Sequence, residues 1–303
     1  MSKLPVSCPS IAALFIVAST ALSAQAQSAA SPTLDKVKSQ GFITVAYRDS
    51  SIPFSYLADG QNPTGFAWEI CGRIVDEVKK ATGRADLQVK TQSVSSANRV
   101  PLLQNGTIDI ECGSTTNNSE RGKQVQFATN YFYTGTRFLV KAGSPIKTLA
   151  DLKGRKVVST TGTTNILVMR NVSRDKGLDL DILSAKDHAE AALLVESDRA
   201  DAFAMDDILL YGIKANANRP DSLAVVGEAL QVEPYAIMLR RDDPGFKQLV
   251  DGTIATLVRS GDFEKLYRKW FQSPIPPKGV NLNAPMSDEL KANLTALSDK
   301  PAL

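Results

Sequence analysis

One order of elements occurs twice in this chain, and it restricts the folds that the chain can adopt. A helix, a turn, a strand that begins with aspartate and a polar strand end are expected at residues 102–116 and again at 193–207. Along residues 107–112 the side chains alternate in character, which is typical of a short strand. We therefore expect two small α/β units of one design rather than one large sheet.

The elements of the first unit alternate between strand and helix. Strands are expected at residues 42–47, 87–91 and 107–112, separated by helices at 70–80 and 100–104. This order implies a parallel sheet with helices on its faces. In such a sheet, ligands collect just outside the carboxyl ends of the strands.

The second unit, with expected strands at 156–160 and 201–205, does not end the chain. A further strand is expected at 234–239, followed by more helices. If these closing elements rejoin the first unit, two strands cross between the units, near 135–141 and 232–235, and form a hinge. The expected division is a signal peptide at 1–26, a first lobe at 27–138 and 235–303, and an inserted second lobe at 139–234.

The first residues have the features of a secretory signal. Lys3 is followed by an apolar run at residues 11–22 and by Ala24-Gln25-Ala26, a small-residue cleavage site. We expect cleavage after Ala26 and a mature chain outside the cytoplasm. The apolar run is too short to span a bilayer, and no later run reaches the roughly 18 apolar residues that a transmembrane helix needs.

Charge and cysteine content narrow the classes of partner. The formal net charge is +3 with no basic tract, which argues against nucleic acid or an anionic membrane as a partner. Two cysteines, Cys71 and Cys112, follow the expected cleavage site. In an oxidising compartment an even pair favours a disulfide, and two buried free thiols are the alternative.

Motifs of the common enzyme classes do not occur. The sequence contains no HExxH, GxSxG, Walker or GxGxxG motif and no cysteine pair with zinc spacing. His188 is the only histidine, so a histidine-based triad has one possible base and no obvious nucleophile. We expect no enzyme activity, no cofactor and no metal.

Charged residues at the strand ends indicate the chemistry of a ligand. Arg48, Arg99 and Arg121 each follow an expected strand of the first unit. The second unit adds Thr163 and Thr164 at a helix start, a ready anion site, together with His188 and Asp206. Three arginines against one or two carboxylates predict a positive cleft for a zwitterion with an additional carboxylate. The structural alternatives are an Arg48 that pairs with Asp49 or another surface acid, a partly buried structural His188, and an Asp206 or Asp207 that caps the next helix.

Five motifs in this chain carry a resemblance to a known family: RDSSIPFSY (48–56), NRVPLLQNGT (98–107), ECGSTTNN (111–118), SAKDH (184–188) and MDD (205–207). They resemble the periplasmic glutamate/aspartate-binding proteins of ABC importers, within solute-binding protein family 3. The resemblance covers nearly all of the mature chain. It implies a type II periplasmic binding protein: two lobes, each a small sheet flanked by helices, joined by two hinge crossings. It also implies a monomer that captures L-glutamate or L-aspartate by hinge closure and delivers it to membrane permease subunits.

The resemblance also implies a role for each site residue. Arg121, assisted by Thr116 and Thr164, would hold the α-carboxylate of the ligand. Asp206 would take the α-ammonium group, with Ser114 alongside.

The side-chain carboxylate of the ligand would be held at the other end of the site. Arg48 and Arg99 would bind it, together with Ser96 and His188. The alternatives are a binder of neutral glutamine or asparagine, which needs fewer cationic groups, and a carboxylate dehydratase on the same scaffold. A sensor module is a further class, although no signalling domain is recognisable. The residues do not rank glutamate over aspartate.

Overall fold

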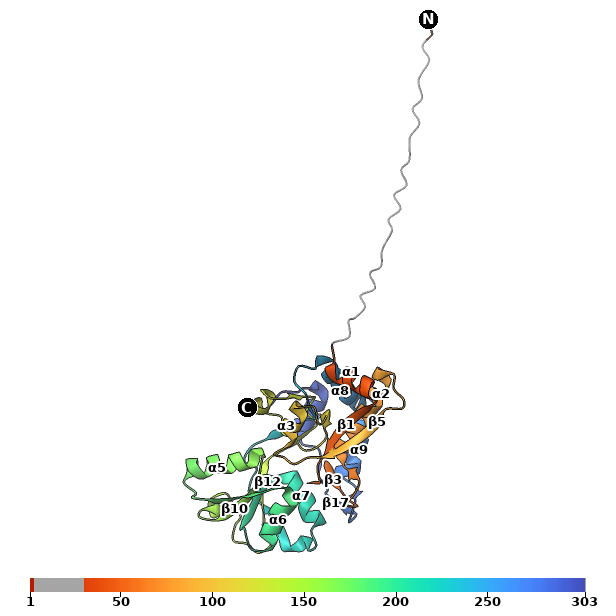
Figure 1. Ribbon diagram of the computed structural model, residues 1–303. Helices are drawn as coiled ribbons and strands as arrows, with labels where there is room; N and C mark the ends of the chain where they lie inside the picture. Colours follow the sequence, from red (N-terminus) through yellow and green to blue (C-terminus); the bar gives the residue numbers. More distant parts are fainter. Residues whose placement is uncertain (3–29, 303) are drawn as a thin grey trace.

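The computed structural model describes residues 1–2 and 30–302 (Figure 1). The features of the expected signal peptide at 1–26 therefore lie outside the described residues. Within the described part of the chain, no helix is both long enough and apolar enough to span a bilayer.

The first sheet combines strands from both ends of the chain. Its order is β5 (Gln88–Ser93), β1 (Phe42–Tyr47), β6 (Ile110–Glu111), β15 (Met238–Leu239) and β7 (Gln126–Phe127). β5, β1 and β6 are parallel as expected, whereas β15 runs antiparallel to both of its neighbours. The last elements of the chain thus rejoin the first.

Helices from both ends of the chain pack around this sheet. Figure 1 shows the late α8 beside the early α1 and α2 in the upper body, and these three helices contact one another. The helices of this part are α1 (Pro32–Gln40), α2 (Phe66–Thr82), α3 (Arg99–Gln104), α4 (Ser119–Gly122), α8 (Pro244–Arg259), α9 (Asp262–Phe271) and α10 (Asp288–Ala296). Short strands complete it: β2 (Ser50–Ser51), β3 (Ser55–Leu57), β4 (Pro63–Thr64), β16 (Pro274–Ile275) and β17 (Val280–Asn281).

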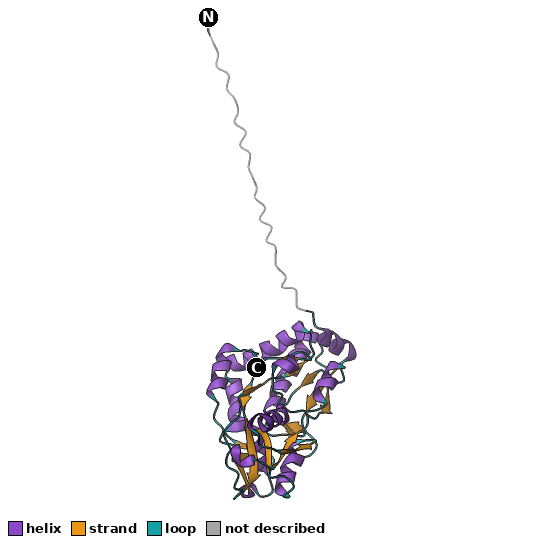
Figure 2. Ribbon diagram, turned by 90° about the vertical axis from the view of Figure 1, so that its left-hand side faces the viewer, coloured by secondary structure: helices purple, strands orange, loops and turns teal. Residues whose placement is uncertain are grey.

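The second sheet has the same mixed design. Its order is β11 (Asp181–Ala185), β10 (Lys156–Thr160), β12 (Ala202–Asp206), β9 (Thr136–Lys141) and β13 (Leu223–Val226). β11, β10 and β12 are parallel, and β9 is antiparallel to β12 and β13. The elements packed with it are α5 (Thr164–Lys176), α6 (His188–Glu196), α7 (Asp207–Asn216), η1 (Ala150–Leu152) and η2 (Pro220–Ser222). Figure 2 shows the strands and helices from a second direction.

Two short strands join the sheets. β8 (Phe132–Thr134) pairs antiparallel with β14 (Glu233–Tyr235), and β8 leads directly into β9 of the second sheet. The single strand expected at 234–239 is in fact two strands, β14 in this ladder and β15 in the first sheet. The expected boundary between residues 138 and 139 falls inside β9, so we propose that the division between the lobes lies at the β8–β14 ladder.

Aromatic residues anchor this ladder in the core of the first lobe. The Phe54 ring lies 4.9 Å from that of Phe132 and 5.1 Å from that of Tyr235, measured between centroids. Phe271 of α9 lies 5.0 Å from Phe132. Such offset and edge-to-face pairs add to the stabilisation that comes from burial alone. Both crossing strands are therefore held by the same cluster.

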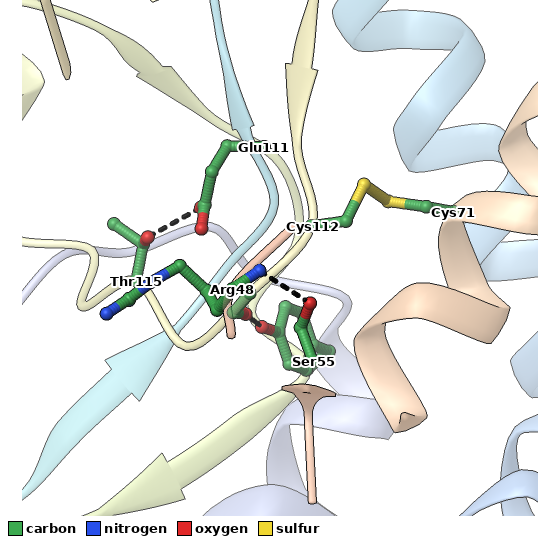
Figure 3. Close-up of a disulfide and its surroundings, with 8 residues drawn as sticks. Arg48, Ser55, Cys71, Glu111, Cys112 and Thr115 are labelled. Atoms are coloured by element: carbon green, nitrogen blue, oxygen red, sulfur yellow. Dashed lines mark hydrogen bonds between the residues drawn. A yellow bond between two sulfur atoms is a disulfide. The ribbon is translucent and has the colours of Figure 1, made fainter. Parts of the chain in front are cut away.

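A disulfide fixes the end of β6. Cys71 of α2 and Cys112, the residue after β6, are bonded, with a Cα–Cα distance of 6.2 Å. Figure 3 shows this bond with Arg48, Glu111 and Thr115 nearby. The expected disulfide is confirmed, and the alternative of two free thiols is wrong. The bond therefore ties the segment that continues into Ser114 and Thr116 to helix α2.

Candidate ligand-binding site

A small cavity lies between the two lobes, where the polar strand ends meet. Its empty volume is about 200 Å³. Residues of both lobes line it: Ser96, Arg99, Ser114, Thr116, Arg121, Thr163, Thr164, Asn165, His188, Met205, Asp206 and Leu209. Eight of the nine expected ligand-binding residues are among them, and the ninth, Arg48, is bonded to Ser96.

Larger hollows occur on the surface of the first lobe. One beside α2 and β5 has an empty volume of about 900 Å³, and one between α2 and α8 about 1050 Å³. Unlike these two hollows, the small cavity brings strand ends of both lobes together around buried ionisable groups. Buried, charge-coupled groups in a cleft are typical of a functional site. We therefore take the small cavity as the candidate site.

Arg48 and Arg99 form the cationic end of the site, and each is only 2% exposed. Arg48 follows β1, and its Nη2 donates to Ser96 Oγ at 2.8 Å. Arg99 begins α3, and its Nη1 donates to Thr115 Oγ1 and lies 3.4 Å from the Ser114 carbonyl oxygen. Arg48 Nη1 and Arg99 Nε are buried and have no hydrogen-bond partner within residues 1–2 and 30–302. These two N–H groups are suited to a ligand carboxylate.

His188 connects the second lobe to Arg48. Its Nε2 lies 3.4 Å from Arg48 Nη2, and its Nδ1 lies 2.9 Å from Thr160 Oγ1. A guanidinium can only donate, so Nε2 accepts and the ring proton resides on Nδ1. Burial and the charges of Arg48 and Arg99 hold the His188 pKa well below its ordinary value, which keeps the ring neutral.

Arg121 reaches from the first lobe to the second. It lies on α4, whose first residues are capped by the Asn118 side chain. Its Nη1 donates to the Thr116 carbonyl oxygen at 2.9 Å and its Nη2 to the Gly162 carbonyl oxygen at 3.1 Å. Burial and the neighbouring charge of Arg99 lower the Arg121 pKa to about 9, so the guanidinium stays charged at neutral pH.

Asp206, at the end of β12, forms an anionic end of the site. Its Oδ1 accepts from Asn165 Nδ2 at 3.1 Å, and its Oδ2 accepts from the Tyr235 hydroxyl. Burial and the charge of Glu233 raise its pKa to about 7. The Asp206 side chain makes no capping hydrogen bond to α7, so the alternative role of helix cap is wrong. Arg48 likewise forms no ion pair with Asp49 among the described salt bridges.

Sequence reasoning missed three polar residues of the site. Glu233 accepts from Thr116 and Thr164, Tyr235 donates to Asp206, and Asn165 also bonds Asp206. Glu233 and Tyr235 lie in a strand of the crossing ladder, away from any sheet end where ligands are sought. The one signal in the sequence that could have identified Glu233 as a site residue is its position before Pro234 in an apolar strand, where an acidic residue is unusual.

The buried carboxylates change the expected charge count. Glu111, Asp206 and Glu233 are each at most 4% exposed, whereas one or two carboxylates were expected. With His188 neutral, three guanidiniums therefore face three carboxyl groups. When all three carboxyl groups are ionised, these charges balance, so the described site lacks the expected excess of positive charge. The pKa of Asp206, about 7, places its ionisation near neutral pH.

Comparisons with known proteins agree on one family. Residues 43–273 match the family model described as bacterial extracellular solute-binding proteins, family 3. The chain is 47% identical over 290 residues to a glutamate/aspartate import solute-binding protein of Escherichia coli (strain K12), covering 96% of both chains. It is 48% identical over 271 residues to an L-glutamate/L-aspartate-binding protein of Pseudomonas aeruginosa, covering 89% of this chain and 90% of that protein.

Solved structures share the fold. An ancestral arginine-binding protein bound to arginine is 28% identical, with a TM-score of 0.68, and the match covers 76% of this chain and 98% of that one. The two-lobed binding-protein fold expected from the sequence is thereby confirmed.

Proposed function

Because the chain belongs to family 3 of the bacterial extracellular solute-binding proteins, we propose that it captures L-glutamate and L-aspartate in the cavity between its lobes. It is a solute-binding component of an ABC importer, not an enzyme, and it works in the periplasm. As a monomer, it delivers the amino acid to the membrane permease subunits.

The juxtaposition of Arg48 and Arg99 supports an acidic ligand. Arg99 lines the cavity, and Arg48 is bonded to Ser96, which also lines it. Each guanidinium has one buried N–H group without a partner among the described residues, which a side-chain carboxylate of the ligand would satisfy. Arg121 would hold the α-carboxylate, and Asp206 would hold the α-ammonium group at the opposite end.

Closure around the ligand follows from the contacts between the lobes. Arg121 bonds the Gly162 carbonyl across the cleft. A Cβ atom at Gly162 would lie 2.6 Å from Cα of Ala97, so the two backbones meet where only glycine fits. Since the ligand contacts both lobes, it binds the closed form better than an open one and shifts the population toward closure. The permease then recognises the closed surface.

Titration calorimetry with L-glutamate, L-aspartate and L-glutamine tests the proposal. Glutamine leaves the Arg48–Arg99 end without a carboxylate, which costs about 2–5 kcal/mol for a buried charge left unpaired. We expect L-glutamate to bind more tightly than L-glutamine by roughly 30-fold or more. Equal or tighter binding of L-glutamine would overturn the assignment to acidic amino acids.

A further inference from the structure

Glu233 is a buried carboxylate in the ladder that joins the two lobes. It begins β14, opposite Thr134 of β8, and is only 4% exposed. An ionised group at this depth is very costly unless hydrogen bonds or opposite charges compensate for its lost hydration. The partners of Glu233 therefore indicate its role.

One oxygen of Glu233 binds a threonine from each side of the cavity. Oε2 accepts from Thr116 Oγ1 at 2.8 Å and from Thr164 Oγ1 at 2.7 Å, while Oε1 accepts from Gln231. Thr116 belongs to the first lobe, and Thr164 begins α5 of the second. Both threonines line the cavity. Glu233 thus controls two hydroxyl groups that face the ligand.

A hydroxyl group carries one proton, so a threonine that donates to Glu233 has none left for a second acceptor. Toward the cavity, Thr116 and Thr164 therefore present lone pairs only. Lone pairs suit an N–H donor and not a carboxylate, so these hydroxyl groups do not supply the help in binding the α-carboxylate that the resemblance implied for the two threonines. Asp206, a further acceptor, lines the same cavity.

From this geometry we propose that Glu233 is a positioning residue. It holds the Thr116 and Thr164 hydroxyls as acceptors and, together with Asp206, makes one end of the cavity select an α-ammonium group. The inference rests on the proposed function and deepens it. The α-carboxylate would then be bound by Arg121 and by the first N–H groups of α5. The Thr163 side chain does not cap these N–H groups.

The test compares L-glutamate with glutarate, which has both carboxylates of glutamate but lacks the ammonium group. Calorimetry measures L-glutamate directly and glutarate by its displacement of L-glutamate. In Glu233→Gln, we expect the affinity for L-glutamate to fall roughly 10- to 100-fold, the range of a hydrogen bond to a charged group. The affinity for glutarate should stay unchanged or increase. Glu228→Gln, at an exposed position shortly before β14, is the matched control and should leave both affinities unchanged.

The outcomes separate this inference from the proposed function. An equal loss for both ligands in Glu233→Gln would show a merely structural role and overturn the inference, as would unchanged L-glutamate binding. If the unmodified protein does not bind L-glutamate, the proposed function fails as well. If Glu233→Gln does not fold, as judged by circular dichroism, Thr116→Val takes its place, because it removes one of the two acceptors and should also weaken L-glutamate more than glutarate.

Discussion

Gly212 of α7 lies directly against the backbone of Ile52, so that a Cβ atom at position 212 would lie only 2.4 Å from the Ile52 carbonyl oxygen. Gly212 belongs to the second lobe, and Ile52 lies between β2 and β3 of the first. The contact therefore exists only while the lobes are together. No side chain fits between them.

Gly212→Ala should weaken ligand binding without destabilising the ligand-free protein. The added methyl group overpacks the closed interface by about 1–3 kcal/mol, which corresponds to a roughly 5- to 150-fold loss of affinity. Within a helix, alanine is favoured over glycine by about 0.5–1 kcal/mol, so an open form should be as stable as before or more so. Calorimetry and thermal unfolding measure the two effects.

Gly252→Ala is the matched control for this prediction. Gly252 is also helical, in α8, but a Cβ atom there meets no atom within 4 Å. This variant should gain the helical stabilisation and keep its affinity. Unchanged ligand affinity in Gly212→Ala would show that this contact does not limit closure.

Arg99→Met should weaken acidic ligands strongly. The variant removes the buried guanidinium that lies 3.9 Å from Glu111, and it leaves the ligand carboxylate with Arg48 as its remaining guanidinium. Truncating one partner of a buried charge pair costs about 2–5 kcal/mol, or roughly 30- to several-thousand-fold in affinity. Calorimetry with L-glutamate measures the loss, and the exposed Arg174→Met serves as control. An unchanged affinity in a folded Arg99→Met variant would remove Arg99 from the site.

Ligand affinity should fall as the pH drops below about 7. Asp206 must be ionised to pair with an ammonium group, and its pKa of about 7 is raised by burial and by Glu233. Asp207 adds to this rise, whereas the hydrogen bonds from Tyr235 and Asn165 oppose it. Binding near pH 7 should therefore release a proton, and affinity should fall by up to about tenfold per pH unit below the pKa.

Calorimetry in two buffers of different ionisation enthalpy detects that proton. Asp206→Asn should abolish the release, and a wild-type protein that releases no proton at pH 7 would contradict the prediction. In the ligand-free protein, pH affects folding stability in the opposite direction to its effect on ligand affinity. The folded state binds the proton more tightly than the unfolded state, so the contribution of Asp206 to stability declines as the pH rises from 3.8 toward about 7.

Removing the disulfide should destabilise the protein more than it weakens binding. The bond closes a loop of 41 residues, for which chain entropy predicts about 4 kcal/mol of stabilisation. The double variant Cys71→Ala/Cys112→Ala should therefore unfold at lower denaturant concentration, as followed by circular dichroism. Unfolding of the unmodified protein under reducing conditions should give the same curve, and an unshifted midpoint would contradict the prediction.

Local patterns predicted the elements well. Strand β1 occupies the residues expected for it, 42–47. Glycine is the usual residue after a helix end, and Gly41 and Gly83 end helices α1 and α2 in left-handed conformations. These features depend on neighbouring residues. Helix α2 begins at Phe66, four residues earlier than expected. Phe66 is buried and packs against Phe271 in the aromatic core, so the first turn of the helix is held there.

Residues at sheet ends were predictable as site residues, whereas residues in the crossing ladder were not. Arg48, Arg99 and Asp206 follow the rule that ligands bind at the carboxyl ends of strands. Glu233 and Tyr235 became part of the site only because β14 passes beside the cavity. That placement depends on pairing with Thr134 and Phe132, about a hundred residues earlier, as the register of β8 and β14 shows. A single sequence gives no local signal for such a pairing.

The β8–β14 ladder has a consequence for engineering. An exchange of the second sheet and its helices alone, from β9 to β13, with those of a relative would replace Thr164, His188 and Asp206 but leave Glu233 and Tyr235 with the recipient. In such a chimera, Thr164 and Asp206 would come from the donor, whereas Glu233 and Tyr235, which bond them, would come from the recipient. A transplant of ligand preference should therefore carry residues 132–235 as one cassette, both connecting strands included.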